Sequence, residues 1–252
     1  GLLRAWRAGN VALANAPGFA RDSARQQLLR FEPLGILREN TLAALDNVGA
    51  PAPCEETPRE PPHVILFTGH RIDSAGRDKP RFPAQGEQEA RAMIAQALAA
   101  EKDRAGDNLL GICGGASGGD ILFHEVCEEL GIPSRVYLVL PEIDYIKASV
   151  ADAGADWVER FRRLLRKSGP KVLSDDDRLP RWLRAKPGYS IWQRSNLWML
   201  YHALNVSAGD LTLLALWDGQ RGDGPGGTED MVKRARDRGA RFVHLDARKL
   251  IH

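Results

Sequence analysis

Residues 108–131 read NLLGICGGASGGDILFHEVCEELG, and this stretch decides the fold. It begins with a short apolar run, continues through two adjacent pairs of glycines, and ends in a segment with helical periodicity that closes at Gly131. Such a pattern predicts a buried strand, a glycine-rich turn and a helix with a glycine C-cap. We therefore interpret the stretch as one strand–loop–helix unit of an α/β protein.

Short apolar runs alternate with helical segments along the rest of the chain from residue 63 onward. Runs that are apolar throughout indicate strands buried on both faces, and their alternation with helices indicates a parallel sheet. We therefore predict an α/β, Rossmann-like, doubly wound fold with a mainly parallel sheet. The expected strands span 63–69, 108–113, 134–141, 171–173, 210–219 and 241–247, and the expected helices span 83–101, 120–131, 156–169, 190–207 and 226–239.

The first quarter of the chain has a different composition. Residues 1–48 show helical patterning, whereas residues 49–62 are rich in proline and acidic residues. The latter composition cannot bury a core and favours extended conformations, which is typical of a linker. The expected organisation is a small helical extension (1–48), a Pro-rich linker (49–62) and a Rossmann-like domain (63–252). We also expect a homo-oligomer, for which the helices of residues 1–48 are candidates.

Composition limits the classes of function. The formal net charge is +2 over 252 residues, so no nucleic-acid partner is expected. No apolar run approaches the length of about 20 residues that a membrane helix needs, so no membrane partner is expected either. Three widely spaced cysteines, Cys54, Cys113 and Cys127, favour a reduced, cytoplasmic compartment. The chain has no CxxC pair and no HExxH motif, and we expect neither a metal nor a cofactor.

Ligands bind outside the carboxyl ends of the strands in doubly wound sheets, so residues directly after each strand are candidates for a binding site. TGHRID (68–73) follows the first strand. Its glycine frees the backbone, and its histidine and arginine can project over the edge of the sheet, the arginine as an anion clamp. The ligand-binding candidates here are Thr68, Gly69, His70 and Arg71, with a solvated turn as the alternative.

The two glycine pairs follow the second strand, where a helix begins. Bare N–H groups at a helix N-terminus bind anions, and glycines let a phosphate or a ribose come close. No Lys-Ser/Thr pair follows the glycines, so the loop is not a P-loop. Asp120 either caps the helix or accepts hydrogen bonds from ribose hydroxyls. The ligand-binding candidates in this loop are Gly114, Gly115, Ser117, Gly118, Gly119 and Asp120.

The same loop also fits the nucleophile-elbow pattern G-x-S-x-G, with Ser117 as the nucleophile. Asp218 and His244 follow in the chain order of the α/β-hydrolases. However, His244 lies inside an expected strand, and no HGGG-type oxyanion loop is present. A serine hydrolase is therefore kept as an alternative, together with a module that functions through oligomerisation alone.

A second glycine-rich loop, WDGQRGDGPGGTED (217–230), follows the fifth strand and leads into a helix. Two such loops on parallel strands can face each other across a crevice, which favours a nucleotide or a nucleotide-derived ligand. Trp217 or Phe82 could stack on a base, whereas Trp192 and Trp198 favour core or interface positions. The ligand-binding candidates in and near this loop are Asn196, Trp217, Asp218, Gly226, Gly227, Thr228 and Glu229.

With these motifs in this order, the segment 63–250 resembles the SLOG superfamily, named for the Smf/DNA-processing proteins and the LOG (Lonely Guy) proteins. The resemblance rests on TGHR (68–71), GICGGASGGDILF (111–123), RSN (194–196) and WDGQRGDGPGGTEDMV (217–232). It is closest to bacterial SLOG-like domains attached to TPR, TRAFs-binding or signalling modules. It implies a Rossmann-like fold that binds nucleotides or nucleotide-derived ligands, and some members sense a cyclic ADP-ribose-like signal in antiphage defence.

The resemblance also implies a possible enzymatic role. LOG proteins cleave the N-glycosidic bond of nucleoside monophosphates, using the glutamate of PGGxGTxxE and an upstream arginine. The matching positions here are Asp230 and Arg194, which makes them the candidate catalytic residues. Aspartate is one methylene shorter, and acid–base catalysis tolerates little displacement. We therefore expect binding or sensing of a nucleotide-derived ligand between the two loops, with LOG-like hydrolysis as the alternative.

Overall fold

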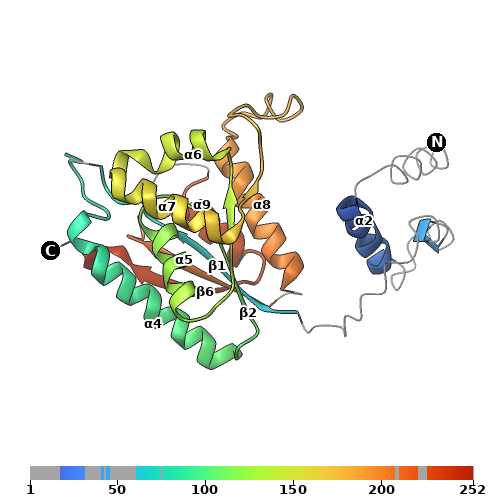
Figure 1. Cartoon of the computed structure of the whole chain (residues 1–252), viewed down its shortest axis with the longest axis horizontal. Helices are drawn as coiled ribbons and strands as arrows, with labels where there is room; N and C mark the ends of the chain where they lie inside the picture. Colours follow the sequence, from blue (N-terminus) through green and yellow to red (C-terminus); the bar gives the residue numbers. More distant parts are fainter. Residues whose placement is uncertain are drawn as a thin grey trace. The chain divides into compact units, whose positions relative to one another are not determined.

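The structure is a computed structural model that describes residues 18–31, 41–42, 44–45, 61–74, 76–207, 210–220 and 226–251. The chain divides into two units, Gly1–Arg59 and Glu60–His252. Helix α2 (Gly18–Phe31) belongs to the first unit and lies within the expected helical extension, whereas residues 46–60 are outside the described part. The elements that follow belong to the second unit (Figure 1).

The second unit is built on a six-stranded sheet in which every pair of neighbouring strands is parallel. The strand order is β4-β3-β2-β1-β5-β6. The predicted α/β fold with a parallel sheet is thus confirmed. The strands are β1 (His63–Gly69), β2 (Leu109–Cys113), β3 (Ser134–Leu138), β4 (Lys171–Val172), β5 (Leu211–Trp217) and β6 (Arg241–Asp246).

Helices cover both faces of the sheet because its central strands are apolar on both sides. In β1, Ile65 and Phe67 pack into one hydrophobic cluster, and Val64 and Leu66 pack into a second one. Successive side chains of a strand point to opposite faces, so each face needs its own cover. The first cluster includes residues of α4 (Glu87–Ala105), α5 (Gly119–Glu129) and α7 (Ala155–Ser168), and the second includes residues of α8 (Ile191–Val206) and α9 (Thr228–Arg236) (Figure 1).

The chain adds strands first on one side of β1 and then on the other. From β1 the chain builds outward to β4, then returns through α8 and adds β5 on the other side of β1. Because parallel crossovers are right-handed, the two directions place their helices on opposite faces of the sheet. The loops after β1 and β5 therefore diverge, and such a switch point is where doubly wound sheets bind ligands.

Several of the expected boundaries are wrong. Strand β3 ends at Leu138 instead of residue 141, because neither neighbour pairs with it beyond that residue. The helix expected from residue 83 begins as a 3₁₀ turn, Ala84–Gly86, before α4. Three further elements lie where the sequence patterns predict none: α6 (Glu142–Ser149), η2 (Ala151–Ala153) and η3 (Ala247–Leu250).

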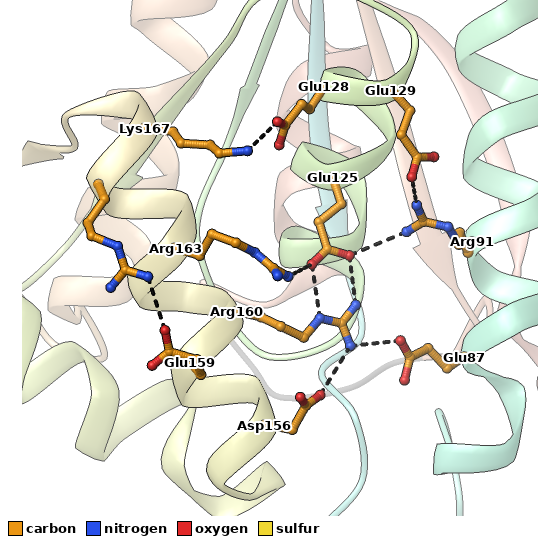
Figure 2. A network of polar contacts seen from close by, with 11 residues as sticks. Glu87, Arg91, Glu125, Glu128, Glu129, Asp156, Glu159, Arg160, Arg163 and Lys167 are labelled. Atoms are coloured by element: carbon orange, nitrogen blue, oxygen red, sulfur yellow. Dashed lines mark hydrogen bonds and ion pairs between the residues drawn. The ribbon is translucent and has the colours of Figure 1, made fainter.

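Ion pairs join the outer surfaces of α4, α5 and α7 (Figure 2). Arg160 on α7 donates to the Glu125 carboxylate of α5 through Nε at 2.9 Å and Nη2 at 2.7 Å, and to Glu87 of α4 through Nη1 at 2.7 Å. Burial alone would raise the pKa of Glu125. The hydrogen bond and charge of Arg160 outweigh it, together with the charges of Arg91 and Arg163, so this pKa lies below its ordinary value.

A hollow of about 800 Å³ lies among these same helices. Every charged residue that lines it is ion-paired with another residue of the network (Figure 2). Because the charges satisfy one another, the hollow offers no unbalanced charge to a ligand. We therefore interpret this ion-pair network as a structural feature that holds α4, α5 and α7 together.

Replacing Arg160 by methionine is expected to lower the free energy of unfolding by about 1–3 kcal/mol, because Glu125 and Glu87 lose their shared donor. Urea denaturation measures the loss, which should shrink in about 1 M NaCl because salt screens the remaining charges. Arg166→Met is the matched control, since Arg166 is 63% exposed and pairs with the equally exposed Glu159. A similar loss of stability in both variants would show that the ion-pair network stabilises the protein no more than a single surface ion pair does.

Candidate functional site

A cleft of about 740 Å³ lies at the carboxyl ends of β1 and β2 and reaches the N-termini of α8 and α9. It sits at the switch point of the sheet, so the loops after β1, β2 and β5 surround it. The predicted ligand-binding residues that line it are Thr68, Gly69, His70, Arg71, Gly114, Asp120, Asn196, Gly226, Gly227 and Thr228. The predicted residues outside its lining are Gly115, Ser117, Gly118, Gly119, Arg194, Trp217, Asp218, Glu229 and Asp230.

The first glycine loop uses most of its N–H groups within the protein. The Gly115 N–H donates to Tyr145 Oη at 3.1 Å, and the Ala116 N–H donates to Asp120 Oδ2 at 3.2 Å. The Ser117 N–H donates to Ser149 O at 3.0 Å, and the Gly119 N–H donates to His70 O at 3.1 Å. Donors that are already bonded cannot cradle a phosphate without losing their present partners. The loop therefore shapes the cleft, and the phosphate-cradle prediction for its N–H groups finds no support in this geometry.

Ser117 is fully buried, and its Oγ has no hydrogen-bond partner among the described residues. The two other members of the hydrolase alternative are not arranged around it. Asp218 Oδ1 lies 3.3 Å from Nε2 of His70, and His244 Nε2 lies 2.8 Å from the Trp217 carbonyl oxygen. A nucleophile needs an accessible oxygen next to its base, so the structure does not assemble the serine-hydrolase triad.

His70 is buried and joins the ends of β1 and β5. Its backbone N–H donates to Leu216 O at 3.0 Å, and its Nε2 lies 3.1 Å from the backbone nitrogen of Asp218. Arg81 approaches both side chains, with Nη2 3.1 Å from His70 Nδ1 and Nε 3.5 Å from Asp218 Oδ2. Burial alone would raise the pKa of Asp218. The Gln220 N–H and the charges of His70 and Arg81 outweigh it and hold this pKa below its ordinary value.

Arg71 lines the cleft, but its guanidinium is held by the segment after β3. Nη2 pairs with Asp152 of η2, and Nη1 donates to the carbonyl oxygen of Ala148 on α6 at 3.3 Å. The buried Nε has no hydrogen-bond partner among the described residues. An anion that binds Arg71 would therefore have to compete with Asp152. The guanidinium is less available to a ligand than the predicted anion clamp requires.

Asp120 stands in the first turn of α5 and lines the cleft. Its Oδ2 accepts the Ala116 N–H at 3.2 Å, so the carboxylate braces the glycine loop. Burial raises the pKa of Asp120 to about 6, although the Ala116 N–H, the Cys113 thiol and the charge of Arg71 act in the opposite direction. The protein thus keeps a carboxylate in the cleft whose ionisation its own environment disfavours.

His124 on α5 fixes the other side of the same loop. Its Nε2 lies 3.0 Å from Gly114 O, and its Nδ1 lies 2.8 Å from Ser134 Oγ. A carbonyl oxygen only accepts, so Nε2 carries the hydrogen and Nδ1 accepts from the serine hydroxyl. Burial lowers the pKa of His124 to about 4, so this neutral arrangement persists at neutral pH.

The second loop reaches the cleft through Gly226 and Gly227; residues 221–225 lie outside the described part. Gly226 has a φ of 99°, and a Cβ on it would lie 2.8 Å from the backbone nitrogen of Gln193. Asn196 Nδ2 donates to Gly226 O at 2.7 Å, which holds the loop against α8. Gly227 is the N-cap of α9 and supplies no side-chain hydrogen bond. Helix α9 therefore begins at the cleft without a side-chain cap.

The candidate catalytic residues have other roles in this geometry. Asp230 Oδ2 accepts from Gln193 Nε2 and from the Gly226 N–H, both at 3.3 Å, and Oδ1 accepts from Arg234 Nε at 2.8 Å. Asp230 thus fastens the second loop to α8. Arg194 is partly exposed and does not line the cleft. The LOG-like alternative stays a prediction, and neither of its two candidate catalytic residues lines the cleft.

Among the aromatic residues that line the cleft, Trp192 is the most exposed. It is 36% exposed, lines the cleft, and lies 6.1 Å from the ring of Tyr145. Trp217, the expected stacking residue, instead donates from Nε1 to Gln220 O and lies 5.8 Å from the His244 ring. Phe82 is fully buried in the core. Trp192 is therefore the better candidate for contact with a base.

Helix α6 supplies cleft residues that the sequence reading missed. Tyr145, Ala148 and Ser149 line the cleft, together with Asp152 of η2. A signal was present, because Pro141 is followed by Glu142 and Asp144, and a proline followed by first-turn acids is typical of a helix start.

No protein-family model, curated protein or solved structure matches the chain. Within the described part of the chain, none of the helices combines the length and apolar character that crossing a membrane requires. In the same part, no three His, Cys, Asp or Glu side chains gather in a way that could hold a metal ion. Function is therefore inferred from the geometry of the cleft.

Proposed function

We propose that the cleft binds a nucleotide-derived ligand, with a phosphate at the N-terminus of α9 and the base against Trp192. The observation that carries this proposal is the start of α9 at the switch point of the sheet, where the N-cap residue Gly227 supplies no side-chain partner. The first N–H groups of a helix have no partner within the helix, and the helix dipole favours negative charge there.

The dimensions and the lining of the cleft agree with this class of ligand. Its volume of about 740 Å³ falls within the range of small-molecule sites, about 300–1,000 Å³. Trp192 presents a partly exposed ring, and stacking on an aromatic ring suits any base because every base has a π-face. Gly226 and Gly227 line the cleft, and because they carry no side chains they let a phosphate approach the backbone.

The resemblance to the SLOG superfamily rests on these same loops and supports a sensing role. We propose that the natural ligand is a nucleotide-type messenger, of the cyclic or ADP-ribose class, in bacterial defence. Binding without cleavage agrees with the position of Asp230, whose carboxylate oxygens are occupied by Gln193, Gly226 and Arg234.

Isothermal titration of the folded chain with AMP, ATP, ADP-ribose and cyclic dinucleotides tests the proposal. We expect at least one of them to bind, and Trp192→Ala to weaken that binding by about 10- to 100-fold because base stacking contributes about 1–3 kcal/mol. Trp182→Ala is the matched control, since Trp182 is 77% exposed and does not line the cleft. A folded protein that binds none of these ligands would overturn the proposal, and release of free base would favour the LOG-like alternative.

A further inference from the structure

The floor of the cleft beside Gly114 places an acceptor next to a donor. A Cβ on Gly114 would lie 2.6 Å from Asp120 Oδ2 and 3.4 Å from Tyr145 Oη, so both oxygens lie close to the place that a side chain at this position would take. Asp120 comes from α5 and Tyr145 from α6, and both line the cleft. The missing side chain at position 114 leaves the room that the two polar groups occupy.

The carboxylate of Asp120 retains acceptor capacity after its internal bonds are made. An ionised carboxylate has about four lone-pair sites, and the Ala116 N–H takes one of them. Burial holds the pKa of Cys113 well above its ordinary value, so this residue remains a thiol and donates to Asp120. Arg71, whose charge also acts on the carboxylate, is itself paired with Asp152. Asp120 can therefore accept further hydrogen bonds from a ligand.

Tyr145 supplies the complementary donor. Its Oη accepts the Gly115 N–H at 3.1 Å, which leaves the hydroxyl hydrogen to donate. The ring is stacked on Phe161, with centroids 5.5 Å apart and planes inclined by 9°, so the position of the hydroxyl is fixed. Burial raises the pKa of Tyr145 above its ordinary value and keeps the phenol protonated at neutral pH.

We infer that Asp120 and Tyr145 recognise the vicinal hydroxyls of the ligand's ribose and thereby select ribonucleotides over deoxyribonucleotides. Two neighbouring hydroxyls donate two hydrogens, which a carboxylate accepts, and they offer lone pairs to the phenol. A site built to bond a hydroxyl strongly rejects the analogue without it, because its own polar groups are then left unpaired. The inference rests on the proposed nucleotide function and adds the specificity of the same site.

Other groups in the cleft are less suited to this role. The amide nitrogen of Asn196, another ligand-binding candidate of the sequence, donates to Gly226 O at 2.7 Å and holds the loop. A phosphate beside Asp120 would meet a like charge that disfavours it. At the start of α9 the helix dipole favours a phosphate, and of the two acidic residues in that turn, Glu229 and Asp230, the second is paired with Arg234. The ligand is thus oriented with its phosphate toward Gly227 and its sugar toward Gly114.

Calorimetric titration of the wild-type chain with AMP, ATP and their 2′-deoxy counterparts tests the inference at pH 7.5. We expect the deoxynucleotides to bind about 10- to 100-fold more weakly, the loss typical of a hydrogen bond to a charged group. Ribose 5-phosphate separates recognition of a nucleotide from recognition of a free sugar, and we expect it to bind more weakly than AMP because it lacks the base.

Two variants test the assignment to these side chains. Asp120→Asn should remove most of the preference for AMP over 2′-deoxy-AMP, and it should weaken binding of the deoxynucleotide less, because that ligand has only its 3′ hydroxyl to lose. Tyr145→Phe should cost about 3- to 10-fold in the same direction. The matched controls are Asp144→Asn and Tyr201→Phe, since both residues lie on exposed surfaces outside the cleft lining. Both controls should retain the wild-type preference for ribose.

The pH dependence supplies a further readout. The titratable and charged groups that face Asp120 are Cys113 on β2, Arg71 after β1 and Tyr145 on α6. Asp120 itself has a pKa of about 6, so its carboxyl becomes ionised as the pH rises through that value. The preference for ribonucleotides should therefore grow over this range in the wild type and should not change with pH in Asp120→Asn. Equal affinity of the wild type for ribo- and deoxynucleotides would overturn this inference alone, whereas no nucleotide binding at all would overturn the proposed function with it.

Discussion

Replacing Gly118 by alanine is expected to lower the free energy of unfolding by about 3–5 kcal/mol. This residue precedes α5 with φ 93° and ψ −125°, a conformation that residues with a side chain rarely adopt. A Cβ there would lie 2.5 Å from the Ile72 nitrogen and 3.0 Å from the carbonyl carbon of Arg71. These are backbone atoms, so they cannot rotate away. They belong to the bridge between Arg71 and Gly118 that ties the loops after β1 and β2 together.

Urea denaturation followed by circular dichroism measures this loss. Gly131→Ala is the matched control, because Gly131 has a φ of 68° and open space around it. Its loss should be about 1–2 kcal/mol, the cost of a positive φ without a clash. Equal losses in the two variants would mean that backbone strain alone, and no contact between the loops, accounts for the effect at Gly118.

Replacing Asp120 by asparagine is expected to raise the free energy of unfolding by about 3 kcal/mol at pH 7, because a shift of one pKa unit corresponds to about 1.4 kcal/mol. Burial raises the pKa of this carboxyl from 3.8 to about 6, which means that the folded protein prefers its neutral form. The neutral amide has nearly the same shape and can still accept the Ala116 N–H. It removes the cost of holding an ionised group in this place.

The sign of the pH dependence separates this effect from other consequences of the substitution. Below pH 3.8 the carboxyl is protonated in both the folded and the unfolded states, so the two proteins should differ little. As the pH rises from 3.8 through 6, the wild type loses the stability that its neutral carboxyl provided, and the difference should reach its full size above pH 6. Asp144→Asn, on the exposed side of α6, is the matched control for the substitution itself. A constant difference at every pH would contradict the assignment to Asp120.

The two expectations for Asp120 belong together. Asparagine should make the protein more stable, yet it should weaken the binding of a ribonucleotide. Side chains whose charge opposes folding are concentrated at functional sites, because selection retains them there for what they bind. If Asp120→Asn raises stability and removes the discrimination between ribose and deoxyribose, then the ionised carboxylate lowers stability and is needed for binding. This result would identify the cleft as the functional site.

Much of the fold could be predicted because the decisive patterns are local. The apolar run 64–67 of β1 required helices on both faces of the sheet, and the glycines within 114–119 predicted a turn between strand and helix. Boundaries were less accurate where pairing decides them, as in β3, which ends where its neighbours stop pairing. Helix α6 was missed although Pro141 and the acids after it carried a start signal.

The candidate site was predictable in its location and less so in its chemistry. Thr68 at the end of β1, Gly114 directly after β2 and Gly226 in the loop after β5 all line one cleft at the carboxyl ends of the parallel strands. Trp192 was expected in a core or an interface, and it lines the cleft because its position on α8 faces the diverging loops. Its ring lies 6.1 Å from that of Tyr145, and Gly226 of the second loop lies beside its backbone, although both residues are far from it in the sequence.

By itself the sequence determined the layered α/β architecture, the parallel sheet and the edge of that sheet where a ligand could bind, because hydrophobic periodicity and glycine positions act over short distances along the chain. The tertiary structure alone decided which donors are available. The N–H groups of 108–131 that looked free in the sequence are taken by Tyr145 and Ser149 of α6 and by the loop after β1, whereas the start of α9 lacks a side-chain cap. A hydrogen bond depends on the position of two groups in space, and here the partners are separated by tens of residues along the chain.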